Sequence, residues 1–328
     1  MNILIFSTVF YPGIGGIENQ TLLLIREFVN KGHAVKVITS QRQTKPLENI
    51  PVYYKPGIIK SIQLFLWCTT YYMPNISLKG IWLLIFNPKK RWVISHNDFS
   101  SCNSKGAVPA LKNIANKFCS KNIAVSKSIA TYLGPSAAVI HNGFDDGVFK
   151  LYQDENRCYD FVFLGRLVSQ KGCDLLIKAC SELARPFTLR IIGTGPEENS
   201  LKKLSENLGL SDSVKFEGAL VGEQLARALN RCRVMVVPSI QGEGFGMVVL
   251  EGLACGCKII AADAAGLSEA VSNHGIMFEM GNQKELTRLL QESFTYNGAD
   301  LSAQEEKQKH LRKHSKSAVA DNYLKYFN

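Results

Sequence analysis

The sequence predicts an α/β protein with two doubly wound parallel sheets, one in each half of the chain. Short apolar runs rich in Val and Ile alternate with segments of helical periodicity, which is typical of parallel strands joined by crossover helices. This alternation begins at residue 2 and starts again near residue 159, after a polar stretch at 150–159. A length of 328 residues is enough for two domains of ordinary size. Two such halves in tandem predict two sheets that face each other across a ligand-binding cleft.

The domain boundary is expected at residue 150, where the composition becomes polar. Residues 1–150 then form the N-terminal domain and residues 151–305 the C-terminal domain. Residues 306–328 are expected to be a helical segment that packs back on the N-terminal domain. A basic patch at 307–316 lies at its start.

In the N-terminal half, strands at 2–6 and 34–39 flank a helix at 17–31. The loop at 11–16 contains Gly13, Gly15 and Gly16 but lacks the third glycine of a dinucleotide fingerprint. The remaining elements follow the same alternation: strands at 91–96, 121–125 and 137–140, a helix at 111–119, and a helix at 126–133 with Ser126 as its N-cap. The strand at 91–96 places His96 at its carboxyl end, where open α/β sheets bind ligands.

Two segments of this half have an apolar pattern with two interpretations. Residues 58–86 are rich in aromatic side chains; we expect core helices and a strand, and a membrane-touching face is the alternative. In the helix at 111–119, apolar residues follow helical spacing with lysines between them: Leu111, Ile114, Ala115, Phe118 and Cys119. We expect this helix to pack on the sheet, with a basic membrane-facing role as the second interpretation.

In the C-terminal half the alternation is regular. Strands are expected at 159–164, 187–192, 214–217, 234–237, 258–262 and 276–279, and helices at 173–183, 200–208, 222–230, 247–254, within AAGLSEAV and over most of 283–328. Gly193 and Gly195 follow a strand, but Glu198 stands where a nicotinamide or flavin site needs a third glycine. The sequence therefore does not favour a dinucleotide cofactor.

Residues 238–260, PSIQGEGFGMVVLEGLACGCKII, contain the strongest functional signal. Three glycines between 242 and 246 allow a tight turn, and the helix that follows directs its free N–H groups and positive dipole end into that turn. Glu243 lies in the turn, and Glu251 lies in the apolar helix. A buried glutamate is costly without a hydrogen-bond partner. A ligand-binding role is thus favoured over a structural pairing with backbone or an arginine.

Charge is unevenly distributed along the chain. Residues 1–150 contain 17 Lys and Arg against 6 Asp and Glu, whereas residues 151–328 contain 21 against 22, so the net charge of +10 resides in the N-terminal half. This predicts an anionic partner for that half: nucleic acid, a phosphorylated substrate or an acidic membrane. Nine scattered cysteines indicate reduced thiols in a cytoplasmic protein, and no zinc-type spacing is present. Residues 1–10 lack the features of a signal peptide, and no apolar run is long enough to span a bilayer.

Together these motifs resemble those of retaining glycosyltransferases of family 4, which adopt the GT-B fold of two Rossmann-like domains facing across a cleft. The spacing of Glu243 and Glu251 is similar to the family's E-x7-E signature, and GRLVSQKG at 165–172 to its G-R-x4-K-G loop. IIGTGPE, the NGFD at 142–145 and the P-x-x-G-G at 12–16 agree as well. The resemblance covers nearly the whole chain. A short N-terminal half, GLACGC after the second glutamate, and Ala265 in place of a common glycine depart from it.

The resemblance implies transfer of a sugar from a nucleoside-diphosphate sugar, with UDP first and GDP second, to a hydroxyl with retained configuration. Arg166 and Lys171 would hold the diphosphate and stabilise the leaving group, Glu251 would accept both ribose hydroxyls, and Glu243 would accept sugar hydroxyls. His96 would lie near the sugar and the acceptor, with a structural role as the alternative. The further donor-binding residues implied are Gly15, Gly16, Gly165, Gly193, Gly244, Phe245, Gly246 and Met247. Basic side chains and helix amides take the place of a cation, so no metal and no cofactor are expected, and no protein nucleophile or general base is nominated.

In the leading hypothesis the N-terminal domain is the acceptor side and the C-terminal domain the donor side. The enzyme works at the inner face of the cytoplasmic membrane as a peripheral protein. Its basic half meets acidic lipid and a lipid-linked saccharide acceptor in bacterial surface polysaccharide assembly, of the O-antigen, lipopolysaccharide or capsule type. A soluble acceptor and a GT-B sugar-nucleotide epimerase are the alternatives among enzymes. A basic nucleic-acid-binding protein is the non-enzyme alternative. It is disfavoured because the aromatic residues lie in apolar runs and not among basic residues.

Overall fold

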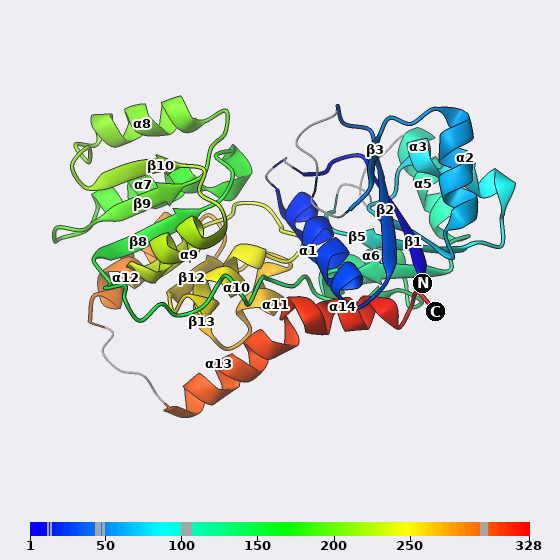
Figure 1. Cartoon of the computed structure of the whole chain (residues 1–328). Helices are drawn as coiled ribbons and strands as arrows, with labels where there is room; N and C mark the ends of the chain where they lie inside the picture. The colour runs from blue at the N-terminus through cyan, green and yellow to red at the C-terminus, as the bar shows by residue number, and fades with distance from the viewer. Residues whose placement is uncertain (12, 14, 43–46, 48–49, 100–106, 296–300) are drawn as a thin grey trace. The chain divides into compact units, whose positions relative to one another are not determined.

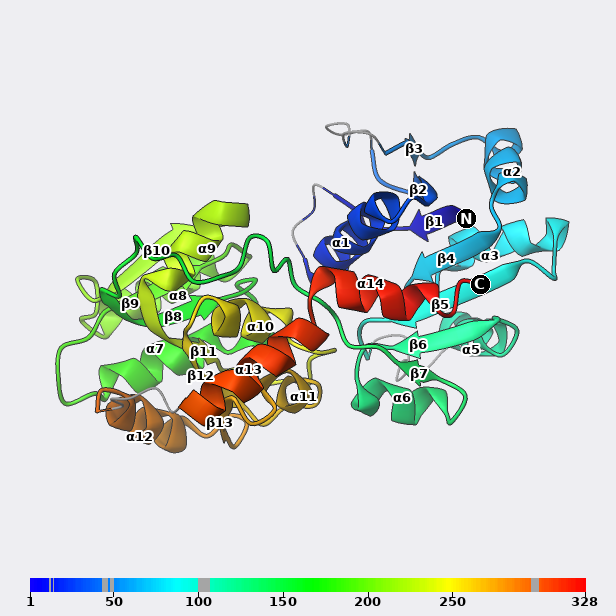
Figure 2. The ribbon, with the colours of Figure 1, turned by 60° about the horizontal axis from the view of Figure 1, so that its bottom comes forward.

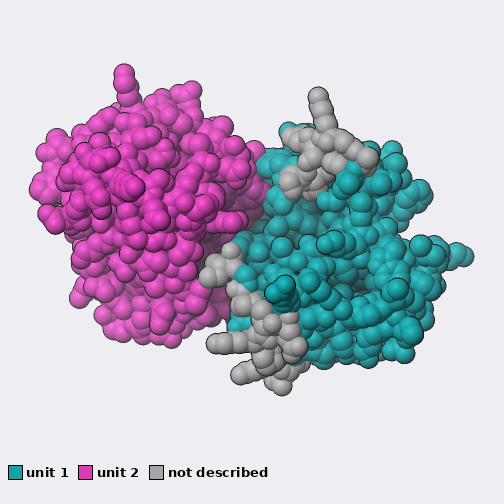
Figure 3. Space-filling view, turned by 90° about the horizontal axis from the view of Figure 1, so that it is seen from above, with its two compact units in different colours: residues 1–143, 314–328 teal, residues 144–313 magenta. Residues whose placement is uncertain are grey.

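The computed structural model describes residues 1–11, 13, 15–42, 47, 50–99, 107–295 and 301–328. They form two compact units, coloured separately in Figure 3: unit 1 is Met1–Gly143 with His314–Asn328, and unit 2 is Phe144–Lys313. The chain thus leaves unit 1 after Gly143 and returns to it at His314, so residues 306–313, which were expected to pack back on the N-terminal domain, belong to unit 2. Residues after Phe144 already bond to unit 2, since Tyr152 N donates to Asn230 Oδ1 at 2.9 Å.

Unit 1 is built on a parallel sheet. Its strands, among the described residues, are arranged in the order β3-β2-β1-β4-β5-β6-β7, so the direction of winding reverses between β1 and β4. Such a reversal is the point where doubly wound sheets bind ligands. The strands are β1 (Asn2–Ser7), β2 (Ala34–Thr39), β3 (Val52–Tyr54), β4 (Thr70–Pro74), β5 (Arg91–His96), β6 (Lys121–Ala124) and β7 (Ala138–Val139).

Helices cover both faces of this sheet. The helical elements are α1 (Gly16–Asn30), α2 (Ile58–Trp67), α3 (Leu78–Ile81), η1 (Trp82–Phe86), α5 (Ala107–Asn116), α6 (Lys127–Leu133) and α14 (Lys316–Leu324). Alternate residues of β1 serve the two faces: Ile3 and Ile5 pack with α1 and α14, while Leu4 and Phe6 pack with α2 and η1. The predicted N-cap of α6 is confirmed, because Ser126 Oγ accepts a hydrogen bond from Ile129 N.

The last helix of the chain completes the core of unit 1. Figures 1 and 2 show α14 beside α1. The ring of Phe327, just after α14, lies 5.3 Å from that of Phe28 and 5.4 Å from that of Tyr72, measured between centroids. Thr70 Oγ1 donates a hydrogen bond of 2.8 Å to the carbonyl of Phe327. Residues 316–328 therefore belong to unit 1, whereas α13 (Leu301–Lys313) stays with unit 2.

Unit 2 repeats the architecture. Its parallel strands, within the described part of the chain, have the order β10-β9-β8-β11-β12-β13, with the reversal between β8 and β11. The strands are β8 (Tyr159–Leu164), β9 (Leu189–Ile192), β10 (Val214–Gly218), β11 (Cys232–Val237), β12 (Lys258–Ala262) and β13 (Gly275–Phe278). The helices besides α13 are η2 (Ser169–Lys171), α7 (Cys173–Ser181), α8 (Glu198–Asn207), α9 (Gly222–Asn230), α10 (Met247–Ala254), α11 (Leu267–Val271) and α12 (Gln283–Ser293).

The structure corrects two expectations in unit 1. Leu111 and Ile114 of α5, and Phe118 just after it, are 52%, 54% and 78% exposed, so the prediction that they pack on the sheet is wrong. The smaller Ala115 and Cys119 pack against the core in their place. In 58–86 the core prediction is confirmed for Phe65, Tyr71 and Tyr72 and is wrong for Phe86, which is 48% exposed.

Every helix in the described ranges is too short or too polar to cross a lipid bilayer.

Candidate functional site

The predicted residues of the C-terminal half meet at one edge of the sheet in unit 2. Arg166 and Lys171 lie in the loop after β8, and Glu243 lies in the loop after β11. These two strands are neighbours at the point where the winding reverses, so their carboxyl-end loops are adjacent. A hydrogen bond of 3.0 Å from Ile240 N to Gln170 O ties the loops together. The sheet order thus assembles a site from segments that are distant in sequence.

Glu243 is held by two side chains. Lys171 Nζ lies 2.9 Å from Glu243 Oε1, and their side chains are 33% and 13% exposed. The fully buried Ser239 donates its hydroxyl proton to the same oxygen. Ser239 was not identified from the sequence, although a serine directly after the strand-ending Pro238 was a signal for it. Because both contacts use Oε1, the carboxylate has a fixed orientation while remaining partly open to solvent.

Two glycines with positive φ allow the loops to approach this closely. Gly172 has a φ of 66°, and a Cβ there would lie 2.0 Å from the carbonyl oxygen of Pro238. Gly266 has a φ of 88°, and a Cβ there would lie 2.2 Å from the carbonyl oxygen of Glu243. Side chains are strained in this backbone region and would clash at these distances. The neighbouring Ala265 still accepts a bond of 3.0 Å from Glu243 N. A glycine at 265 is thus not needed for that backbone bond.

The amino end of α10 lies three residues after Glu243. Its N-cap is Gly246, with a φ of 96° and no side-chain cap. Phe245 is 2% exposed and anchors the turn, whereas Gly244 and Met247 are half-buried. Free backbone N–H groups and the helix dipole make this end favourable for an anion. The ammonium of Lys171 adds a positive charge to the same loop region.

Glu251 lies on the buried face of α10. Its side chain is 8% exposed, and burial raises the pKa of its carboxyl from 4.5 to about 8. In the part of the chain that the structure describes, no donor contacts this carboxyl. A buried carboxyl without partners costs free energy that hydrogen-bond donors from a ligand can recover. Paired ligand hydroxyls are the chemistry that suits it.

Arg166 completes the positive side of the site. Its side chain is exposed in the loop after β8, which is joined to the loop after β9 by two backbone bonds. Gly165 N donates to Ile192 O at 3.0 Å, and Leu167 N donates to Thr194 O at 2.9 Å. Gly165 and Gly193 therefore lie side by side at the same sheet edge as Lys171.

The predicted residues of the N-terminal half lie in unit 1. Gly15 is the N-cap of α1, and the carboxylate of Glu18 lies against it; around Gly16 a Cβ would meet nothing within 4 Å. Pro12 of the same motif lies outside the described residues.

His96 ends β5 as predicted, and its ring is fully buried. Asn122 Nδ2 donates to Asn116 O, so Asn122 Oδ1 accepts from His96 Nε2 at 2.9 Å. Within the described residues, His96 Nδ1 is then an acceptor without a hydrogen-bond partner. Burial lowers the pKa of this imidazole, which keeps the ring neutral.

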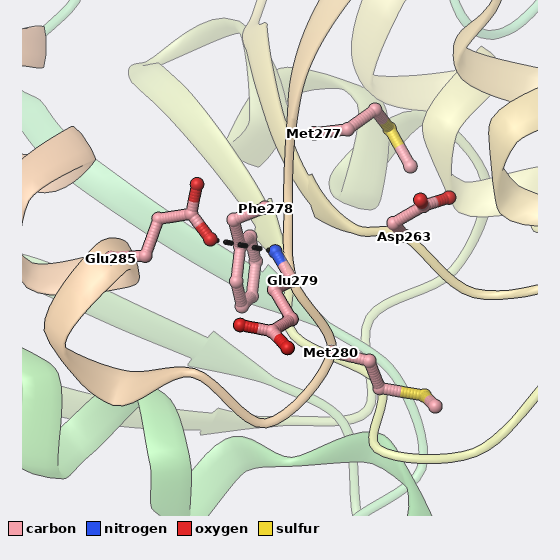
Figure 4. A pocket seen from close by; sticks show the side chains of 6 residues that line it. All are labelled: Asp263, Met277, Phe278, Glu279, Met280 and Glu285. Carbon is pink, nitrogen blue, oxygen red and sulfur yellow. Dashed lines mark hydrogen bonds between the residues drawn. The ribbon is translucent and has the colours of Figure 1, made fainter.

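Unit 2 also contains an open pocket of about 450 Å³ (Figure 4). It is lined by residues at the carboxyl ends of β12 and β13 and on α12: Asp263, Met277, Phe278, Glu279, Met280 and Glu285. Glu285 Oε2 accepts a hydrogen bond of 2.8 Å from Glu279 N, which Figure 4 marks with a dashed line. Three carboxylates disfavour phosphate here. This pocket is therefore less suited to an anionic ligand than the loops that contain Lys171 and Arg166.

Comparison with known proteins identifies the family. Residues 151–316, just over half of the chain, match the model of glycosyl transferases group 1. The chain belongs to this family. The matched region contains every unit 2 residue described above.

Curated relatives match over part of their length. An uncharacterized glycosyltransferase of Methanocaldococcus jannaschii is 34% identical over 173 residues, which are 51% of this chain and 47% of the relative. A GDP-mannose-dependent alpha-(1-6)-phosphatidylinositol monomannoside mannosyltransferase of Mycolicibacterium smegmatis is 36% identical over 119 residues, 34% of this chain and 31% of the relative. The chain thus spans less than half the length of these relatives.

Solved structures match over nearly the whole chain. HepE of Anabaena, solved in complex with UDP and glucose, has a TM-score of 0.80 and 20% identity and covers 99% of this chain and 98% of its own. A glycosyltransferase from Rickettsia africae has a TM-score of 0.82 and 18% identity, with the same coverage. These matches confirm the predicted GT-B fold with two Rossmann-like domains.

Proposed function

We propose that this protein is a retaining glycosyltransferase of family 4 that moves a sugar from a nucleoside-diphosphate sugar to an acceptor hydroxyl. The observation that carries the proposal is the assembly at one sheet edge of unit 2. There Lys171 is paired with the Glu243 carboxylate beside a helix amino end that has no side-chain cap. On the same helix lies the buried carboxyl of Glu251, which has no partner among the described residues. These groups suit the three parts of such a donor: diphosphate, sugar and ribose.

Each group has a distinct task in this proposal. Lys171 and Arg166 bind the diphosphate, and their charges stabilise the leaving group as the bond to the sugar breaks. The α10 amino end provides further N–H donors to the same charge. Glu251 accepts the two ribose hydroxyls, and Glu243 offers its partly exposed carboxylate to sugar hydroxyls. Lysine, arginine and helix amides then do the work for which other transferases use a metal.

Retention of configuration follows if the acceptor hydroxyl attacks from the face that the diphosphate leaves. The new bond to the anomeric carbon forms as the bond to the diphosphate breaks, and an oxygen of the departing diphosphate takes the proton of the acceptor hydroxyl. In this proposal unit 1 holds the acceptor and provides Gly15 and Gly16 to the donor phosphate. His96 would then provide its unpartnered Nδ1 to a substrate hydroxyl, and the alternative remains a structural role.

The donor and acceptor are proposed at the level of their chemistry. The Anabaena HepE structure contains UDP and glucose, which supports UDP as the first choice of nucleotide, and the mycobacterial relative's GDP-mannose makes GDP the second. A lipid-linked saccharide is the proposed acceptor, because the basic half of the chain suits a phosphorylated lipid. A role in bacterial surface polysaccharide synthesis would follow. A soluble acceptor remains the second candidate.

A thermal-shift screen against UDP, GDP and their sugars tests the donor site. The matching nucleotide should raise the melting temperature of the unaltered chain and of Glu206→Ala, an exposed control on α8. Glu251→Ala should abolish the shift, and a full shift in that variant would refute the ribose role.

Product analysis by NMR distinguishes a transferase from an epimerase. A transferase leaves the sugar on the acceptor, whereas an epimerase releases a rearranged sugar without one.

A further inference from the structure

Exposed apolar side chains are concentrated on one part of unit 1. Of the 17 large hydrophobic residues that are exposed among the described residues, nine lie on or next to three neighbouring helical elements. We call these nine the apolar face: Ile58, Ile59 and Leu66 on α2, Ile85 and Phe86 on η1, Val108, Leu111 and Ile114 on α5, and Phe118 just after it. Scattered exposed leucines are ordinary, but a concentration of this kind indicates an interaction surface.

The three elements cover the same side of the sheet. Leu64 and Phe65 of α2, Leu83 of η1 and Ala115 of α5 all pack into one core cluster with β4 and β5. Their opposite sides carry the apolar face. Figures 1 and 2 both show α2 and α5 on this side of unit 1, and Figure 2 shows α3 between them.

The pattern on α5 is that of an amphipathic helix whose apolar stripe points away from the core. Val108, Leu111 and Ile114 recur every three residues, which places them on one side of the helix, and the exposed Phe118 lies just after its end. Lys112 and Lys117 flank this stripe. A helix of this composition lies in the plane of a membrane interface, with its apolar stripe among acyl chains and its lysines at the headgroups.

The charge of the region around the apolar face indicates which kind of partner it binds. Residues 49–144 contain 11 Lys and Arg but one acidic residue, Asp98. A second copy of the chain would bring a like-charged face, which opposes self-association. Nucleic acid would need aromatic platforms, whereas this stripe is mainly aliphatic. Acidic phospholipid satisfies both the apolar side chains and the lysines.

We propose that the apolar face inserts into the interface of an acidic phospholipid bilayer and that Lys112 and Lys117 bind its headgroups. The basic composition alone predicts attraction to acidic lipid; the structure adds a defined surface and shallow insertion. This proposal concerns unit 1 and does not depend on the chemistry at the Lys171 site.

Cosedimentation of the full chain with vesicles of phosphatidylglycerol and phosphatidylcholine tests the proposal, without donor or acceptor present. The triple variant Leu111→Ser/Ile114→Ser/Phe118→Ser should bind at least tenfold more weakly. Lys112→Glu/Lys117→Glu should bind the vesicles about fivefold more weakly for each lysine replaced. The binding that remains should depend less on salt concentration than that of the unaltered chain. Val221→Ser and Lys203→Glu, exposed positions of unit 2, are the matched controls and should bind as the unaltered chain does.

Two further measurements distinguish insertion into the bilayer from adsorption at its surface and from misfolding of a variant. In Phe118→Trp, brominated acyl chains should quench the added fluorescence beyond that of the unaltered chain. Circular dichroism and thermal unfolding check that each variant is folded. The proposal is overturned if the triple variant binds vesicles normally or if no acidic vesicle is bound. It is also overturned if the triple variant changes only a monomer–dimer equilibrium in sedimentation, because the face would then contact a second copy.

Discussion

Substituting Glu251→Gln tests whether the buried carboxyl on α10 lowers the stability of the ligand-free protein. Burial raises the pKa of this carboxyl from 4.5 to about 8. Because its folded-state pKa lies above its unfolded value, the folded chain binds more protons between these values, and the free energy of unfolding falls as pH rises. Each unit of separation corresponds to about 1.4 kcal/mol, so the full cost of the charge above pH 8 is about 5 kcal/mol. Glutamine has the same shape and avoids this cost.

Urea unfolding of both proteins, from about pH 5 to pH 8, measures the effect. The stability gained by Glu251→Gln should be small at the acid end and grow by about 1.4 kcal/mol per pH unit. Glu206→Gln, at an exposed position of the same unit, should show no such trend. Parallel stability curves for Glu251→Gln and the unaltered chain would refute the reasoning. Added nucleotide should flatten the pH dependence of the unaltered chain, because ribose hydroxyls that bond to the carboxylate favour its charged form.

Three further predictions concern the loops of unit 2. Arg166→Ala and Lys171→Ala should each lower turnover about 100-fold or more in a nucleotide-release assay, and activity near that of Lys203→Ala would exclude a role at the diphosphate. Ser239→Ala removes the hydroxyl bond to Glu243, so turnover should fall about tenfold while nucleotide affinity in calorimetry stays nearly constant; an equal loss of both would contradict an orienting role. Gly172→Ala should lower the free energy of unfolding by about 1–3 kcal/mol, clearly more than Gly209→Ala. Both positions have positive φ, but at Gly209 a Cβ meets nothing, so equal losses would show that the contact with Pro238 is unimportant.

The bounds of several parallel strands in both sheets could be predicted closely from the sequence. The observed bounds of β5, β8 and β12 agree with the predicted ones, because strands buried on both faces appear as continuous apolar runs. Strand β3 was not predicted; it has three residues, lies at the sheet edge and is half-buried throughout. So short a strand, without a fully buried side, leaves no clear pattern.

Periodicity also has a physical limit, which α5 illustrates. The helical spacing of the apolar residues at 111–119 predicts an amphipathic helix, but it does not predict which of these residues face the sheet. Ala115 and Cys119 are the residues that pack against the core, because they are small enough to let this segment lie close to it. The exposed stripe could not be predicted without the positions of α2 and η1.

The candidate site was predicted as a set of residues but not as a geometry. Lys171, Glu243 and Glu251 were identified from motifs, and the burial of Glu251 followed from its apolar neighbours. The ion pair between Lys171 and Glu243 depends on β8 and β11 being adjacent, which is a property of sheet order. Ser239 became visible as a partner of Glu243 only when the turn was folded.

The return of the chain to unit 1 through α14 has a consequence for protein engineering. A fragment that ends at Gly143 would leave the rings of Phe28 and Tyr72 without their aromatic covers, Tyr323 and Phe327. Chimaeras that exchange unit 1 between relatives must therefore transplant two separate stretches, the first 143 residues and the final helix, from the same parent. A single crossover near the middle of the gene would combine a sheet from one parent with a lining evolved for another.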